Sequence, residues 1–112
     1  MTDTIFGKIA RREIPANIVA ESARCLAFRD VAPQAPVHVL VIPKQPFATL
    51  NDVDDASLLG ELLMLAREVA RTEGLADDGY RVVINTNANG GQSVFHMHAH
   101  VLGGRALRWP PG

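Results

Sequence analysis

The sequence predicts an α+β domain built on an antiparallel sheet of about five strands, with one short and one long helix. Apolar residues recur every three or four positions between Leu58 and Ala70, which is the clearest helical pattern in the chain. Short β-branched and apolar runs lie before and after this segment. The order of a helix, strands, a long helix and further strands is typical of an antiparallel sheet with its helices on one side.

A short first helix is predicted near the N-terminus, because apolar residues fall on one face at helical spacing. Pro15 disfavours helical geometry in the residue before it, so we expect this helix to end there after about three turns. Its apolar face would consist of Ile5, Phe6 and Ile9, and its cap of Asp3 or Thr4.

Five segments are predicted to be strands. The first two would form a hairpin joined at Ala23 and Arg24. The third is a nearly continuous apolar run, typical of a strand buried on both faces, and His38 is its one polar residue. The predicted strands cover residues 18–22, 25–30, 37–42, 80–85 and 94–102.

The long helix has clear signals at both ends. Gly74 follows the last apolar position, where a left-handed residue commonly ends a helix, and Leu75 can make the apolar contact of that cap. Gly60 inside the helix is either tolerated or allows a close backbone approach, for example to another subunit. The candidates for the N-terminal cap are Asn51, Asp52, Asp54 and Asp55.

Composition limits the function classes. The chain has 112 residues, of which 47% are hydrophobic and 21% charged, so one domain over residues 1–112 is expected. A net charge of −1 disfavours nucleic acid as the main partner. No apolar stretch approaches the ~18 residues that a membrane helix needs.

A cytoplasmic location is expected from the same reading. Residues 1–4 lack the basic and apolar regions of a signal peptide. Cys25 is the only cysteine, so no internal disulfide can form, which suits a reducing compartment. Its simplest role is that of a small buried apolar side chain.

Three histidines alternate with apolar residues in the last predicted strand. Alternate residues of a strand point to opposite faces, so His96, His98 and His100 would share one face, while Phe95, Met97, Ala99 and Val101 would face the core. A solvent-facing strand without a task would more commonly carry threonine, lysine or glutamate. The row of imidazoles therefore indicates a functional site.

Two kinds of chemistry are open to this row. Zinc is disfavoured, because same-face residues lie ~6.6 Å apart and three of them cannot close on one ion, although two with His38 might. The alternative is an imidazole nucleophile or acid and base, with His98 flanked on both sides by another imidazole.

The loop before this strand, residues 86–93, is polar and carries Gly90 and Gly91. Its backbone N–H groups, together with the side chains of Gln92 and Ser93, suit a phosphate. The chain has no G-x-x-x-x-G-K-[ST] motif and no obvious carboxylate cluster for Mg²⁺. A phosphoryl or nucleotidyl transfer without a metal or cofactor remains.

These residues resemble the histidine triad (HIT) family, in the branch called histidine triad nucleotide-binding proteins. The similarity centres on His96 to Leu102, with Gly-Gly-Gln-Ser-Val-Phe before it and Gly-Gly-Arg after it. It extends along nearly the whole chain, through residues 5–9, 14–15, 28–30, 33–36, 38, 41–43, 79–81 and 109–112. The loop 86–89 departs from relatives that carry acidic residues there, which leaves the preferred amine open.

The resemblance implies hydrolysis of purine nucleoside 5′-phosphoramidates, with nucleotides such as AMP and GMP as ligands. His98 would attack the α-phosphorus and carry a nucleotidyl intermediate, with His38, His96, His100 and Ser93 in catalytic support. Asp30 would accept the ribose hydroxyls, and Val31, Ile5, Phe6, Ile9 and Phe28 would line the base pocket. The phosphate would be held by Asn85, Gly91, Gln92, Ser93 and His100.

The resemblance also implies a homodimer whose sheets join across the interface, with Trp109 reaching toward the partner's site. Taken from the residues alone, Asp30 is more often a turn former, and Trp109 either folds over its own core or docks on a neighbour. Two rival functions remain: a nucleotide-binding interaction module with vestigial activity, and a hydrolase of dinucleoside polyphosphates.

Overall fold

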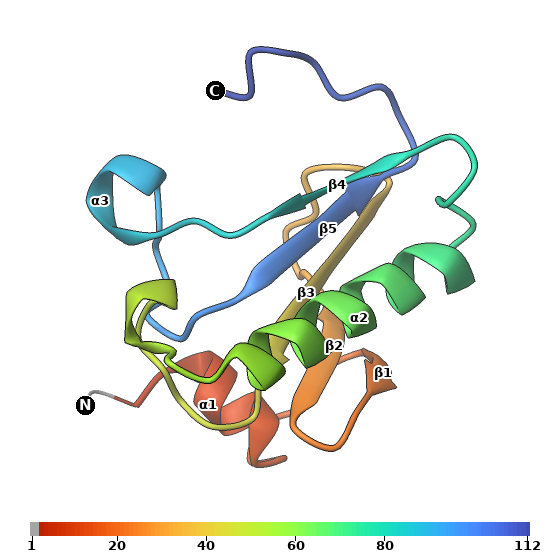
Figure 1. Ribbon diagram of the computed structural model, residues 1–112. Helices are drawn as coiled ribbons and strands as arrows, with labels where there is room; N and C mark the ends of the chain where they lie inside the picture. Colours follow the sequence, from red (N-terminus) through yellow and green to blue (C-terminus); the bar gives the residue numbers. More distant parts are fainter. Residues whose placement is uncertain (1–2) are drawn as a thin grey trace.

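In the computed structural model, which describes residues 3–112, five antiparallel strands form one sheet in the order β1-β2-β3-β5-β4 (Figure 1). The α+β prediction is confirmed. Residues 1 and 2, part of the segment in which no signal peptide is predicted, lie outside the described residues. The strands are β1 (Ile18–Glu21), β2 (Cys25–Arg29), β3 (Val37–Pro43), β4 (Tyr80–Val83) and β5 (Ala99–Gly103); the helices are α1 (Ile5–Ala10), α2 (Ala56–Thr72) and α3 (Asn87–Gly90), with a 3-10 turn η1 (Leu50–Asp52).

β3 lies at the centre of the sheet, between β2 and β5. Every residue of β3 after Val37 is buried, including His38. Both faces of this strand are therefore covered, as its continuous apolar sequence predicts.

α2 covers one face of the sheet and has the predicted caps (Figure 1). The Asp55 carboxylate accepts hydrogen bonds from the backbone N–H groups of Ser57 and Leu58. At the other end Gly74 has a φ of 77°, and the Leu75 N–H donates to the Ala70 carbonyl at 2.8 Å. No helix within residues 3–112 is long and apolar enough to cross a membrane.

α1 lies on the opposite face of the sheet, so the prediction that both helices share one side is wrong. Phe6 and Ile9 pack with Leu26 and Phe28, whereas their neighbours in β2, such as Ala27, pack with α2. An amphipathic pattern shows which face of a helix is buried, but it does not show which face of the sheet that helix covers.

α1 is also shorter than three turns. Thr4 caps it by accepting a hydrogen bond from the Gly7 N–H at 3.1 Å, as predicted. The helix ends at Ala10, because Arg12 adopts a left-handed φ of 61°, which cannot continue a right-handed helix.

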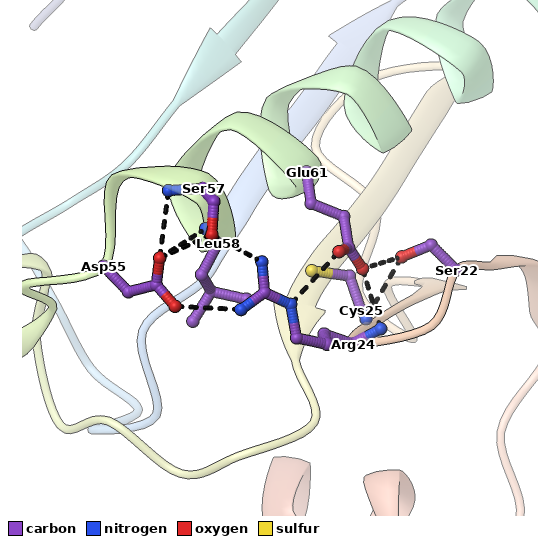
Figure 2. Close-up of polar contacts among 7 residues, drawn as sticks. All are labelled: Ser22, Arg24, Cys25, Asp55, Ser57, Leu58 and Glu61. Carbon is purple, nitrogen blue, oxygen red and sulfur yellow. Dashed lines mark hydrogen bonds and ion pairs between the residues drawn. The ribbon is translucent and has the colours of Figure 1, made fainter.

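The hairpin of β1 and β2 is tied to the start of α2 by Arg24 (Figure 2). Its guanidinium contacts Asp55 at 2.9 Å and Glu61 at 3.2 Å. Glu61 also accepts hydrogen bonds from the Ser22 hydroxyl and the Arg24 backbone N–H. Hydrogen bonds from Ser57 and Arg24 lower the pKa of Asp55 to about 2, so the helix cap stays ionised over the ordinary pH range.

The last two strands are shorter than predicted. β4 ends at Val83 instead of residue 85, and β5 begins at Ala99 instead of residue 94. Residues 94–98 have no partner in the sheet; the Met97 N–H donates instead to the Phe47 carbonyl at 2.7 Å. Phe95 is 44% exposed and does not join the core, because the alternation of faces holds only from Met97 onward.

Candidate active site

A cavity of about 640 Å³ opens between α1, the segment before β1, the end of β2 and the histidine segment. Apolar side chains form much of its wall, and the imidazoles of His98 and His100 and several other polar side chains form the rest. The Phe6 ring meets the His98 ring edge to face, with 5.0 Å between centroids. The cavity thus joins an apolar surface that suits a flat ring to polar groups that suit a phosphate.

The structure brings most of the predicted site residues to this cavity and leaves others outside its wall. The residues in the wall are Ile5, Phe6, Ile9, Phe28, Asp30, Val31, Ser93, His98 and His100. Those outside it are His38, Asn85, Gly91, Gln92, His96 and Trp109.

The three histidines lie on one side, as predicted, and this is the side that α1 covers. The Phe6 ring contacts both His96 and His98, and the rings of His98 and His100 lie 4.9 Å apart between centroids. Met97 and Ala99, which alternate with them, pack in the cluster under α2.

The backbone fixes which nitrogen of His98 carries the proton. Its Nδ1 lies 2.7 Å from the carbonyl oxygen of His96. A carbonyl can only accept, so Nδ1 must be the protonated nitrogen. The lone pair of the neutral ring is therefore on Nε2, which leaves this atom free to act as a nucleophile.

A second chain of hydrogen bonds fixes the proton of His100. The Gln34 N–H donates to His38 Nδ1 at 3.0 Å, so the proton of His38 is on Nε2. That Nε2 donates to His100 Nδ1 at 2.8 Å, which places the His100 proton on Nε2. His100 Nε2 is buried, and no atom of residues 3–112 makes a hydrogen bond to it. It is a free donor beside His98, ready for a negatively charged oxygen.

His96 holds the start of the histidine segment in place. Its side chain makes no hydrogen bond to the side chains of the other histidines. Its Nε2 donates to the Pro43 carbonyl at 2.7 Å, and its ring is 1% exposed. The ring thereby holds the start of the histidine segment against the end of β3.

Burial keeps these imidazoles neutral near pH 7. It lowers the pKa of His38, His96 and His98, since the charged ring loses its hydration. The pKa of His100 falls furthest, to about 4, through burial and repulsion from the neighbouring His98 and His38. Asp30 opposes part of the shift in His38, because its carboxylate lies 3.4 Å from His38 Nε2.

The loop before the histidine segment forms a short helix, α3, that ends at Gly91 with a φ of 80°. Ser93 is the loop residue in the wall of the cavity, and it is exposed. The Gln92 side chain is buried and turned toward backbone groups. Asn85 is half-buried beneath Gly90.

Asp30, His38 and His100 are the residues in the described part of the chain whose arrangement could hold a metal ion. One ligand atom from each lies within 4.8 Å of the others. This set contains only one of the three alternating histidines, in line with their spacing. An ion there would have to displace the proton shared by His38 and His100.

Two groups of residues in and around the site are not predicted from the sequence. Backbone atoms, such as the Gln34 N–H and the Pro43 carbonyl, set the imidazole tautomers, and sequence carries no signal for them. The second group lines the cavity, and none of its members is predicted as a site residue. The further residues in the cavity wall are Ile14, Pro15, Ala16, Asn17, Arg29, Leu40 and Val94.

Comparison with known proteins gives a consistent result. Residues 11–107 match the HIT domain. The chain is 63% identical over 112 residues to an uncharacterised HIT-like protein of Synechococcus elongatus, covering 98% of this chain and 97% of that protein. It is 50% identical over 107 residues to the purine nucleoside phosphoramidase of Escherichia coli, covering 94% and 90%.

A solved structure, a HIT family hydrolase from Legionella pneumophila, superposes with a TM-score of 0.94 at 53% identity, covering 98% of this chain and 100% of that one. The family match spans most of the chain and includes the three alternating histidines, of which His98 and His100 lie in the cavity wall. The chain therefore belongs to the histidine triad family.

Proposed function

We propose that this protein hydrolyses purine nucleoside 5′-phosphoramidates through a nucleotidyl intermediate on His98. The observation that carries the proposal is the fixed tautomer of His98, which leaves the Nε2 lone pair free in a ring that forms part of the cavity wall. The similar protein of Escherichia coli is named as a purine nucleoside phosphoramidase, which supports this substrate class.

The reaction has two balanced steps. His98 Nε2 bonds to the α-phosphorus, the P–N bond breaks, and the amine leaves with one added proton. The Ser93 hydroxyl, exposed in the cavity wall, can relay that proton from solvent. Water then attacks phosphorus and gives one proton to solvent, which balances the proton taken up in the first step; the P–N bond to His98 breaks, and the nucleoside monophosphate is released with His98 neutral again.

The neighbouring groups suit the rest of the substrate. The His100 Nε2–H can donate to a phosphate oxygen, since no protein atom uses it. We assign the base to the apolar wall and the ribose hydroxyls to Asp30, whose carboxylate lies beside His38. The base pocket would comprise Ile5, Phe6, Ile9, Phe28 and Val31, and the phosphate site Asn85, Gly91, Ser93 and His100.

The test replaces His98 with asparagine, which keeps a polar side chain but has no imidazole. Turnover of adenosine 5′-phosphoramidate should fall by at least ~10³-fold, as expected when a nucleophile is removed. The affinity for AMP should stay within a few-fold, and the thermal midpoint should confirm folding. Turnover close to that of the wild type would refute the proposal.

Two further measurements separate the rival functions. A nucleotidyl adduct trapped with the wild-type enzyme should map to His98 by mass spectrometry. The rate on a diadenosine polyphosphate should be much lower than that on the phosphoramidate. A higher rate on the dinucleotide would assign the enzyme to that reaction instead, and no turnover of either would favour a binding module.

We further propose that the protein is a homodimer in which β4 of each copy joins the two sheets. β4 is an edge strand, and its Tyr80 and Val82 are each 37% exposed. Val82 pairs with Val101, which faces α2, so Val82 lies on the α2 side of the sheet. On that same side α2 exposes Leu63 and Met64. A second copy of the chain could cover these two residues together with the exposed side chains of β4.

Trp109 would complete this arrangement. It is 81% exposed and does not fold over the core of its own chain. The Arg81 guanidinium of β4 holds the backbone just before it, donating to the Arg108 carbonyl at 2.7 Å. The C-terminal segment thus starts next to the proposed interface, from which Trp109 can reach the partner's site.

A further inference from the structure

Gln92 is the buried polar side chain of the loop that precedes the histidines, and it is 8% exposed. Its Oε1 accepts a hydrogen bond from the Asn87 N–H at 2.9 Å. Its Nε2 donates to the Ala48 carbonyl at 2.8 Å and to the Val94 carbonyl at 3.1 Å. Both amide hydrogens and the amide oxygen are thus used by backbone groups of the protein, and Gln92 itself is not among the residues that line the cavity.

Gln92 contacts a segment on the other side of the loop, residues 43–48, which consists of the last residue of β3 and the five residues after it; we call it the backing segment. It receives three hydrogen bonds from the loop and the histidine segment, by way of Gln92 Nε2, His96 Nε2 and the Met97 N–H. Residues 94–98 have no partner strand, so these contacts replace a sheet ladder there.

We propose that Gln92 is a positioning residue, whose buried amide fixes Gly91 and Ser93 relative to His98 by binding three backbone groups. Its side chain does not touch the substrate. This inference rests on the proposed function, in which a phosphate lies between Ser93 and His98. It replaces the role implied by the family resemblance, in which Gln92 itself holds the phosphate.

The physical basis is the high cost of leaving buried polar groups without partners. Removing the amide would orphan the Asn87 N–H and the carbonyls of Ala48 and Val94. The loop can recover their hydrogen bonds only by moving these groups toward water. Ser93, which follows Gln92 directly, would lose its fixed position beside His98, while the apolar wall contributed by α1 and β2 would stay in place.

The test uses Gln92→Met, which keeps the length of the side chain and removes its hydrogen bonds. Gln45→Met is the matched control, because Gln45 is exposed and lies in the backing segment. Binding of AMP and of adenosine is measured by calorimetry, and amide hydrogen exchange is measured in the ligand-free proteins. Adenosine lacks the phosphate, so the difference between the affinities for AMP and for adenosine gives the contribution of the phosphate to binding.

The expected result for Gln92→Met is a loss of AMP affinity of ~10-fold or more, with adenosine affinity within ~2-fold of the wild type. Exchange at the Asn87 amide and over residues 93–97 should become faster without any ligand. Gln45→Met should change none of these. Should the methionine variant not fold, Gln92→Asn, whose amide reaches one methylene less far, gives the same comparison.

Three outcomes would overturn the inference. Unchanged AMP affinity would show that the amide is not needed. A loss of AMP affinity with unchanged exchange in the ligand-free protein would mean that Gln92 contacts the phosphate directly. Equal losses for AMP and adenosine would indicate a general role in the fold. Failure of the proposed function would appear elsewhere, as absent turnover in the wild-type enzyme.

Discussion

At the scale of single residues, the site is organised by backbone atoms that decide where imidazole protons reside. The His96 carbonyl takes the Nδ1 proton of His98, and the Gln34 N–H directs the proton of His38 toward His100. Each ring therefore has one defined role as a neutral imidazole. Protonation would add a second N–H to every ring and remove the lone pair on His98.

The pH dependence of kcat/KM follows from this arrangement. Burial lowers the pKa of His98 from its ordinary value of 6.5, so its Nε2 should keep its lone pair at neutral pH and lose it only at a pH below 6.5. Activity on a nucleoside phosphoramidate should therefore fall in acid with a midpoint below 6.5, the ordinary pKa of the ring.

The measurement is a kcat/KM profile from neutral to acid pH, corrected for hydrolysis in buffer without enzyme. A midpoint at or above 6.5 would contradict the buried, neutral state of His98. His100 should not determine the acid side of the kcat/KM profile, because its pKa is lowered further, to about 4.

At the scale of secondary structure, the elements with strong patterns were predictable. The spacing of apolar residues predicts α2, and the caps at Asp55 and Gly74 follow from backbone chemistry that those residue types favour. The buried run of β3 is equally clear in the sequence.

The remaining elements depend on partners that a sequence pattern does not reveal. Residues 94–98 alternate like a strand, yet they hydrogen-bond to the backing segment and leave Phe95 exposed. The spacing of His96, His98 and His100 predicted a functional row, but their tautomers depend on distant backbone groups. The sequence also does not reveal that the Gln92 side chain is buried and hydrogen-bonded to backbone groups. A glutamine in a polar loop is equally compatible with direct binding of a ligand.

The junction of α2 and β5 gives a prediction at this scale. A Cβ on Gly103 would lie 2.7 Å from Leu75 Cδ1 and 3.2 Å from its Cγ, and Leu75 is buried at the end of α2. Gly103→Ala should therefore lower the free energy of unfolding by about 1–3 kcal/mol, as overpacking does in a filled core. Denaturant unfolding gives the value.

Two variants show whether the clash with Leu75 is the cause. In a double-mutant cycle, Leu75→Ala should reduce the cost of Gly103→Ala, since the clashing atoms are gone. If the two substitutions change the free energy of unfolding additively, the clash with Leu75 is not the cause of the destabilisation. Gly60→Ala is the control within α2: a Cβ there meets nothing within 4 Å, and stability should rise by up to about 1 kcal/mol.

At the scale of the whole molecule, the two edges of the sheet differ. The β1 edge carries Glu21, which pairs with Arg12 and Lys44, and its register shifts along the strand. Charges and irregularities of this kind discourage further pairing. The β4 edge instead exposes Tyr80 and Val82, which leaves it open to a second copy.

The proposed dimer should therefore be sensitive to charge at the β4 edge. Val82→Lys places an ammonium group in the joined interface, where a dimer would have to bury it beside the same charge from its partner. The wild type should elute in light-scattering chromatography at twice the chain mass, and the variant at one chain mass. Ala76→Lys adds the same charge at an exposed turn and should leave the dimer intact.

A wild type that elutes at the mass of one chain, or a Val82→Lys variant that stays dimeric, would exclude the β4 edge as the interface. If Trp109 reaches the partner's site, the monomeric variant should also show altered turnover while retaining its affinity for AMP, because the cavity lies within one chain.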